Sequence, residues 1–370
     1  MAILIFILIL LALILVHEFG HFAAAKWFGI KVEEFGVGFP PKLWGKKYGE
    51  TEYTVNALPF GGFVRIFGEN KEEQQDEAVV ADVNDAHRTF SSKSRWIQAL
   101  VLVAGVGMNI VAAWLILSVG YMVGLPAASE DARFGTVTES QVTILEVAPN
   151  SPAAEAGLLA GEKLVGIKAQ TGSFLERDAL SDDVRHFITQ HSGEELTFTL
   201  SRGEQEREVT MTPKEGIVEG KPVVGVVLDD VGILRLLPHT ALLAGAYLTY
   251  DLTIATAVGL WDFFSGIFTG AADFSSVAGP VGIVGVVDEA SQFGLTSLLL
   301  LTAVISINLA IINLIPFPAL DGGRLFMVAL EGVTRRTIPP RVFGILNAAG
   351  FVLLIALMIA VTYNDILRLF

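Results

Sequence analysis

Two histidines and a glutamate near the N-terminus have the residue types and the spacing of a metal site. They lie in the run HEFGH at residues 17–21, inside an apolar stretch of about residues 2–28. On an α-helix, side chains four residues apart lie on one face, so the imidazoles of His17 and His21 could bind one Zn²⁺ ion. Glu18 would then reach a metal-bound water and take its proton. The pattern predicts a zinc site with Glu18 as its catalytic glutamate.

A polar cluster that merely packs two helices together is the alternative for these three residues. A charged side chain within a bilayer costs at least ~2.5 kcal/mol. Three ionisable groups at ligand spacing in an otherwise uncharged helix therefore favour the metal site.

The third zinc ligand must come from another part of the chain, because a catalytic zinc takes three protein ligands and keeps one position open. The chain has no cysteine, which leaves His, Asp or Glu. Asp321 follows the apolar stretch 295–319 and precedes two glycines, which let neighbouring backbone approach closely. Pro316 and Pro318 should break the helix and expose the carboxylate. Asp321 is the predicted ligand, and an ordinary acid in a helix C-terminal turn is the alternative.

Three asparagines lie within apolar stretches, where an amide needs a partner. Asn308 and Asn313 could hydrogen-bond the backbone of an unwound substrate. Asn109 is the notable polar residue of the stretch 97–125. Hydrogen bonding between helices is the alternative for all three.

Composition indicates a membrane protein with four spanning helices. Hydrophobic residues make up 52% of the 370, and the mean hydropathy is +0.57. The net charge of −14 argues against nucleic acid as a partner. A span needs roughly 20 apolar residues. The predicted spans are about 2–28, 97–125, 295–319 and 342–361.

A fifth stretch, about 237–270, is weaker because Asp251 and Asp262 interrupt it. If it crossed once, the two halves of the predicted zinc site would face opposite sides of the membrane. We therefore expect residues 236–291 to form one or two amphipathic helices at the outer interface. A re-entrant segment at 237–270 is the open alternative.

Basic residues flank the cytoplasmic ends of spans. They cluster at residues 26–47, 88–95 and 324–341. This distribution predicts that the zinc site lies toward the cytoplasm. Both termini and the polar segment 128–235 then lie outside.

The polar segments predict two β-containing regions. Residues 52–57 and 62–67 are expected to be strands of a cytoplasmic-side hairpin, 52–67, at the membrane surface. Its edge could accept an extended substrate. A hairpin that is merely packed on the membrane is the alternative, and residues 69–86 are an acidic insertion. The candidate substrate-binding residues of the hairpin are Tyr53, Val55, Phe63 and Val64.

Residues 128–235 form the predicted outer α+β domain. Expected strands lie at 142–147, 163–167, 195–201 and 207–212, and expected helices at 151–158 and 177–190.

Five motifs in this order resemble the site-2 protease family, the M50-type intramembrane zinc metalloproteases. They are HEFGH at 17–21, GFVRIFGE at 62–69, NSPAAEAGL at 150–158, GPVGI at 279–283 and NLIPFPALDGG at 313–323. The last motif is the most specific, and the sequence is most similar to the bacterial regulator-of-sigma-E type. This resemblance covers nearly the whole chain.

The resemblance implies that His17, His21 and Asp321 bind Zn²⁺ and that Glu18 is catalytic. It also implies that Asn308, Asn313, Pro316 and Pro318 help to hold substrate. Residues 128–235 would be a single PDZ-like domain, with a peptide as its possible ligand.

The implied activity is cleavage of single-pass membrane proteins, such as anti-sigma factors or remnant signal peptides, in the bacterial inner membrane. Two alternatives remain. One is a catalytically inactive scaffold that carries a PDZ domain. The other is a metal transporter, which the gathering of ionisable residues at one depth disfavours.

Overall fold

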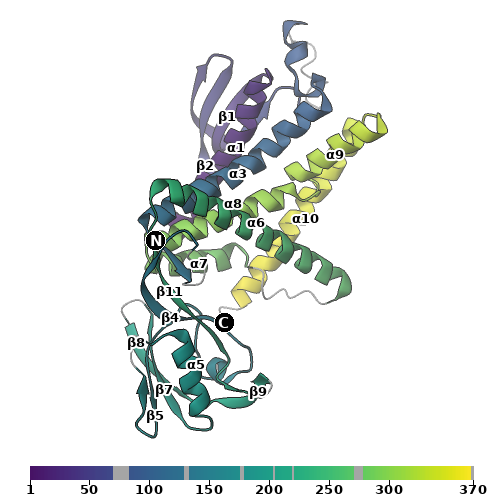
Figure 1. The fold of residues 1–370 in the computed structure, drawn as a ribbon. Coiled ribbons are helices and arrows are strands. Elements are labelled where there is room, and N and C mark those ends of the chain that lie inside the picture. Colours follow the sequence, from purple (N-terminus) through teal and green to yellow (C-terminus); the bar gives the residue numbers. More distant parts are fainter. Residues whose placement is uncertain are drawn as a thin grey trace. The chain divides into compact units, whose positions relative to one another are not determined.

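The computed structural model describes residues 1–69, 83–128, 133–175, 179–202, 205–218, 221–270 and 278–367 (Figure 1). These form two compact units. The first joins Met1–Ser118 to Gly245–Phe370, and the second is Val119–Ala244. Most of the expected acidic insertion at 69–86 lies outside the described residues.

The first unit is built mainly from helices. They are α1 (Ala2–Trp27), α3 (Arg95–Val123), α6 (Pro238–Thr269), α7 (Pro280–Gln292), α8 (Leu295–Leu314), α9 (Asp321–Thr334) and α10 (Pro340–Leu367), of which α3 and α6 also extend into the second unit. Two short 3₁₀ helices, η1 (Val83–Arg88) and η2 (Phe90–Ser92), precede α3.

Five described helices, rather than the expected four, are long and apolar enough to cross a membrane. They are α1, α3, α6, α8 and α10. The first part of the expected interfacial region 236–291 is one helix of 32 residues, α6. Asp251 and Asp262 do not interrupt it, since eleven residues are about three turns and leave both carboxylates on one side. The rest of α6 is mostly apolar.

The hairpin is larger than expected and pairs differently. Strand β1 (Val32–Tyr48) pairs with β2 (Thr51–Ile66), which runs through the expected turn at 59–62. The prediction failed because β1 looks like a loop in the sequence, with several glycines and two prolines.

Both strands bend, so that part of β1 has two neighbours. Phe35 is aligned with both Tyr53 and Val64. The segment around residue 53 also pairs with the far half of β1, whereas the segment around residue 64 pairs on one side only within the described residues. Residues 62–66 therefore form an edge of this sheet.

Aromatic and charged contacts fix the β1–β2 sheet to α1. The Phe22 ring lies 5.5 Å from that of Phe35 and 6.1 Å from that of Tyr53. In the turn between the strands, Glu50 pairs with Lys26 and Arg88, each at 2.6 Å. One buried apolar cluster joins these elements to α3 and α9: Ala25, Ile30, Val32, Ile66, Phe90, Val101, Leu102 and Val328.

The GPVGI motif at 279–283 begins α7 and is held by a distant carboxylate. Asp365 of α10 accepts hydrogen bonds from the backbone N–H groups of Gly279 (3.1 Å) and Gly282 (2.8 Å). The first N–H groups of a helix have no partner within the helix, so this carboxylate satisfies two of them. It thereby fastens the end of α10 to α7, which packs against α1 and α8.

The second unit has a seven-stranded sheet. The strands are β3 (Leu125–Ala128), β4 (Val137–Val147), β5 (Lys163–Ala169), β6 (Phe174–Leu175), β7 (Leu196–Arg202), β8 (Gln205–Met211) and β11 (Val226–Leu234). Their order is β3-β11-β4-β5-β7-β8, and β6 pairs with β5. Strands β9 (Lys214–Val218) and β10 (Lys221–Val223) form a separate pair. Helices α4 (Pro152–Glu155) and α5 (Ser181–Gln190) complete the unit.

The strands expected at 142–147, 163–167, 195–201 and 207–212 correspond to β4, β5, β7 and β8. The expected helices at 151–158 and 177–190 correspond to α4 and α5, which are shorter. Alternation of apolar residues predicted these elements because one face of each strand is buried. The buried core includes Ile144, Ile167, Val184, Phe187, Leu196 and Leu200.

The second unit also contains an ion pair with a buried carboxylate and a partly exposed arginine. Glu162 is 2% exposed, and Arg207 donates hydrogen bonds to both of its carboxylate oxygens, at 2.8 and 2.9 Å. Burial would raise the pKa of Glu162, but the hydrogen bonds from Arg207 and from the N–H of Leu159 outweigh it. The pKa of this carboxyl therefore lies below its ordinary value of 4.5.

Replacing Arg207 with alanine should destabilise the second unit by about 1–3 kcal/mol near pH 7, because the buried Glu162 loses its main partner. A lowered folded-state pKa stabilises above the ordinary value, and this stabilisation is lost as the pH falls through the folded-state value. The deficit should therefore shrink below pH 4.5. Hydrogen exchange of β5, β7 and β8 amides in the intact protein measures it.

Lys214→Ala is the matched control, because the pair between Lys214 and Glu155 is exposed on both sides. Exposed pairs contribute roughly 0–1 kcal/mol. Equal effects of the two substitutions, or a deficit that does not depend on pH, would contradict the assigned role of Glu162.

Candidate metal centre

A break between α8 and α9 presents Asp321. Helix α8 ends at Leu314, and α9 begins with Asp321 itself. The residues between them, which include Pro316 and Pro318, are not helical. A Cβ atom at Gly322 or Gly323 would overlap backbone carbonyl groups of the preceding segment. The expected break and the expected need for glycine are both confirmed.

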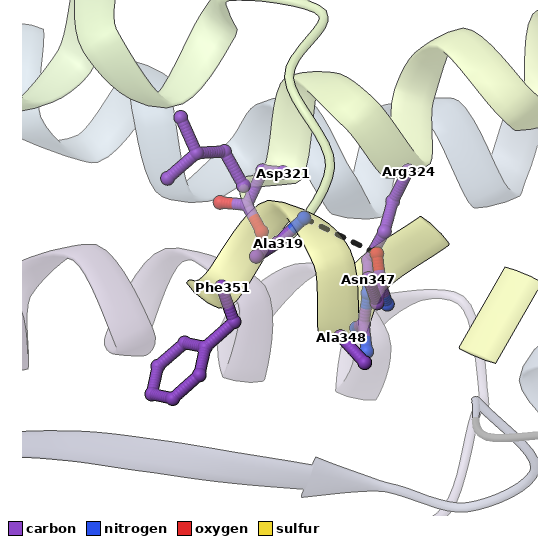
Figure 2. Close-up of a pocket in the computed structure, with 7 residues that line it drawn as sticks. Ala319, Asp321, Arg324, Asn347, Ala348 and Phe351 are labelled. Carbon is purple, nitrogen blue, oxygen red and sulfur yellow. Dashed lines mark hydrogen bonds between the residues drawn. The ribbon is translucent and has the colours of Figure 1, made fainter. Parts of the chain in front are cut away.

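Contacts from α10 support this connecting segment (Figure 2). The N–H of Ala319, whose φ is +75°, donates a hydrogen bond of 3.2 Å to Oδ1 of Asn347. A Cβ at Gly350 would lie 2.6 Å from Pro318, so α10 packs directly on the segment. A pocket beside Asp321 is lined by Ala319, Leu320, Asp321, Arg324, Asn347, Ala348 and Phe351.

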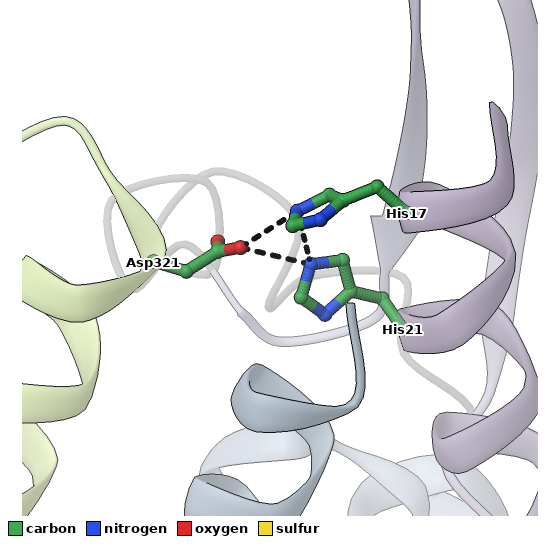
Figure 3. A group of neighbouring side chains, drawn as sticks. All are labelled: His17, His21 and Asp321. Carbon is green, nitrogen blue, oxygen red and sulfur yellow. Dashed lines mark hydrogen bonds and ion pairs between the residues drawn. The ribbon is translucent and has the colours of Figure 1, made fainter. Parts of the chain in front are cut away.

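The Asp321 carboxylate meets both histidines of α1 (Figure 3). Its Oδ2 atom lies 2.9 Å from Nε2 of His17 and 3.0 Å from Nε2 of His21. The two Nε2 atoms are 3.2 Å apart. Each histidine is only 7% exposed. The structure thus brings together the three residues that the sequence predicted as ligands.

These three atoms fit the donor set of a catalytic zinc. A tetrahedral ion with bonds of about 2.0–2.1 Å holds neighbouring ligand atoms roughly 3.4 Å apart, close to the separations here. Two imidazoles and one carboxylate are nitrogen and oxygen donors that Zn²⁺ accepts, and three protein ligands leave one position open. Among the described residues, this is the one His, Asp and Glu cluster with such geometry.

Helix α3 packs against the two histidines of the metal centre. Nδ1 of His21 is 2.9 Å from the backbone oxygen of Val101, which fixes the imidazole with Nε2 facing Asp321. A Cβ at Gly105 would overlap the His21 ring and lie 2.9 Å from Cε1 of His17. A Cβ at Gly20 would likewise overlap the backbone of Ala104. Two glycines therefore allow α1 and α3 to approach at the metal centre.

Glu18 lies next to the three candidate ligands. Its partly buried carboxylate is close enough to interact electrostatically with His17, His21 and Asp321. A Cβ at Gly62, on the edge of the β1–β2 sheet, would be 3.7 Å from Cγ of Glu18. A carboxylate beside an open metal position can accept a proton from water.

The comparisons with known proteins agree with this geometry. The sequence profile described as peptidase family M50 matches residues 5–357. The chain belongs to peptidase family M50.

Curated relatives of this M50 peptidase carry zinc metalloprotease names. A Clostridium perfringens protein with the name 'putative zinc metalloprotease' is 35% identical over 96% of each chain. The zinc metalloprotease RasP of Oceanobacillus iheyensis is 30% identical, over 99% of this chain and 98% of its own. The regulator of sigma-W protease RasP of Bacillus subtilis is 29% identical over the same shares. The predicted enzyme class and cofactor are confirmed: the chain is a membrane zinc metalloprotease.

The predicted substrate-binding residues of the M50 peptidase fall into two groups. Asn308 and Asn313 on α8 are partly buried, and neither amide has a side-chain hydrogen bond among the described residues. Pro316 and Pro318 lie in the segment that leads to Asp321. These four residues precede Asp321 in the chain, on α8 and in the connecting segment.

The other group lies on the β1–β2 sheet. Tyr53 and Val55 have strand partners on both sides, so their backbone groups already belong to the sheet. Phe63 and Val64 are aligned with Gly36 and Phe35 on one side and lie at the edge. Phe63 and Val64 are thus free on one side to accept another strand within the described sheet, whereas Tyr53 and Val55 are not.

Sequence reasoning missed several residues that support the M50 centre. Asn347 is one, and the pairing of Glu69 with Arg324 of α9 is another. Such contacts join positions far apart in the chain, and no local pattern marks them. Glu69 does close the GFVRIFGE motif, which was the one available signal.

Alanine at Gly105 should weaken zinc binding, because its methyl group would push His21 and His17 apart. Overpacking of this kind costs about 1–3 kcal/mol. Gly107→Ala on the same helix is the control, since a Cβ there meets nothing within 4 Å. Zinc content after dialysis against a chelator distinguishes the variants, and equal retention by both would contradict the assigned contact.

Proposed function

We propose that this M50 peptidase is a site-2-type intramembrane protease that hydrolyses peptide bonds within or near transmembrane segments of other membrane proteins. His17, His21 and Asp321 hold the Zn²⁺ ion, and Glu18 is the catalytic base. The convergence of three ligand atoms beside Glu18, two from α1, which is apolar enough to cross a membrane, and one from the start of α9, carries this proposal.

Bound zinc supplies a Lewis acid that acidifies water and polarises the scissile carbonyl. Glu18 takes the proton from the attacking water and later delivers it to the leaving amine. His21, held through Nδ1 by Val101, and Asp321, held at the start of α9, keep the ligand atoms converged. Because the ligand set and the base are complete, an inactive scaffold is disfavoured.

Substrate must be extended before its peptide bonds become accessible. The edge at Phe63 and Val64 can add a strand of substrate to the β1–β2 sheet. The amides of Asn308 and Asn313 then bind backbone groups of that strand. The pocket between Asp321 and Phe351 offers space for a neighbouring side chain.

The second unit is proposed to be a PDZ-like domain outside the membrane. Its sheet and α5 can bind a peptide or exclude the bulky outer part of a substrate. Substrates are then single-pass membrane proteins already shortened on that side. The Bacillus subtilis relative is named for sigma-W regulation, which favours anti-sigma factors over remnant signal peptides here.

The proposed location is the bacterial inner membrane, with both termini and the second unit outside. Basic residues at 26–47, 88–95 and 324–341 support cytoplasmic ends for α1, α3 and α8. In this orientation, the chain must be on the same side of the membrane before α6 and after it. We therefore propose that α6 lies in the outer interface or enters the bilayer and returns with α7.

Replacing Glu18 with alanine should abolish cleavage while zinc remains bound, because the base is lost and the three ligands stay. General base catalysis contributes roughly 10²–10⁴-fold. A purified enzyme and a model single-pass substrate in vesicles measure the rate, and metal analysis measures zinc. The control is Glu146→Ala, an exposed glutamate on β4. Undiminished cleavage by Glu18→Ala would refute the assignment.

Strand addition predicts that a cysteine at Val64 crosslinks to substrate more readily than one at Val55. The chain has no cysteine, so each introduced thiol is unique. Val55 is 42% exposed, so exposure alone would not favour Val64, which is partly buried. Oxidative crosslinking to single cysteines near the scissile bond, with Glu18→Ala enzyme, tests this. Stronger crosslinking at Val55 would exclude the edge as the docking site.

A further inference from the structure

Asn109 of α3 is fully buried, and its amide is incompletely bonded. Its Nδ2 atom lies 3.4 Å from Nδ1 of His17, a long contact. Its Oδ1 atom is buried with no hydrogen-bond partner among the described residues. Leaving such an oxygen unpaired costs about 1–3 kcal/mol. The amide therefore needs a donor that the present arrangement does not provide.

The neighbouring imidazole can provide that donor. Nε2 of His17 faces Asp321 and His21, so Nε2 is the ligand nitrogen in the proposed centre. A neutral imidazole that binds a metal through Nε2 carries its proton on Nδ1. The Asn109 amide lies within 3.4 Å of this Nδ1 atom.

His21 already has the corresponding arrangement, because its Nδ1 atom lies 2.9 Å from the carbonyl oxygen of Val101. Histidines that bind metals generally donate their second N–H to such an oxygen, which fixes the tautomer and the ring orientation. Among the described residues, the only equivalent acceptor within reach of Nδ1 of His17 is the one that Asn109 can supply.

Half a turn of the Asn109 amide exchanges its oxygen and nitrogen without moving any other atom, because the two are alike in size. Oδ1 would then face Nδ1 of His17. We propose that Asn109 is a positioning residue that accepts a hydrogen bond from the Nδ1–H of His17. The inference rests on the proposed zinc centre and deepens it.

A role of Asn109 in helix packing can be distinguished from a role in positioning His17, because the two roles use different atoms of Asn109. The backbone oxygen of Asn109 accepts a 2.8 Å hydrogen bond from Oγ of Ser306, which links α3 to α8. That bond does not involve the Asn109 side chain and survives its replacement. Ser306→Ala removes the interhelical bond and leaves the contact with His17 intact.

The experiment measures zinc affinity of the full-length protein in detergent, by competition with a chromophoric chelator. Asn109→Ala should weaken binding about 10–100-fold, as loss of an outer hydrogen bond does. Asn109→Asp should restore most of the affinity, because its carboxylate oxygen accepts the same bond. Ser306→Ala should bind zinc as the wild type does. The visible spectrum of the Co²⁺-substituted protein should change in Asn109→Ala and be rescued in Asn109→Asp.

Three results would overturn the proposal. Unchanged affinity in Asn109→Ala would leave the amide without a role in the centre. Equal losses in Asn109→Ala and Asn109→Asp would show that the amide nitrogen matters instead. A Ser306→Ala loss as large as that of Asn109→Ala would assign the effect to helix packing. The wild-type protein tests the zinc centre independently of the role of Asn109. If the wild type binds no zinc, the zinc centre itself is refuted.

Discussion

The contact of His17, His21 and Asp321 is the constraint on which the membrane core depends. Ionisable groups are expensive within a bilayer unless they satisfy one another or bind an ion. Here three ligand atoms lie 2.9–3.2 Å apart, although Asp321 is 300 residues from His21 and 304 from His17 along the chain. Every element that brings them together must therefore be positioned to within a fraction of an ångström.

Two different devices achieve this positioning. On the imidazole side, glycines shorten the distance between helices, because any side chain at Gly105 would occupy the space of the rings. On the carboxylate side, the chain breaks after α8, so that Asp321 becomes the first residue of a new helix. A carboxylate is favoured there by the partial positive charge of a helix N-terminus. The same placement lets Asp321 project from a helix end instead of from a helix face.

The sequence predicted the centre better than its surroundings, for a physical reason. The geometry of the HEFGH motif can be predicted locally, because a spacing of four residues on a helix aligns two side chains. Pro316 and Pro318 likewise act locally on the helix that contains them. Sheet pairing, by contrast, joins segments that are not adjacent in the helical sense. Strand β1 shows little alternation of apolar and polar residues, so the sequence does not reveal its pairing with β2. Asp251 and Asp262 look like an interruption in the sequence, whereas on the continuous helix α6 they share one side. The proximity of Asn109 to His17 likewise joins distant positions.

The edge of the β1–β2 sheet and the candidate base belong to one surface, which constrains how a helical substrate can be cleaved. A Cβ at Gly62 would lie 3.1 Å from Leu15 and 3.7 Å from Glu18 on α1, so the edge begins directly against the helix that carries the base. An unwound substrate loses its internal backbone hydrogen bonds, and unpaired groups are costly in an apolar environment. In the proposed mode of docking, the strand edge replaces those bonds beside Glu18. The residue at position 62 must then be small, because any side chain there would separate the edge from the base.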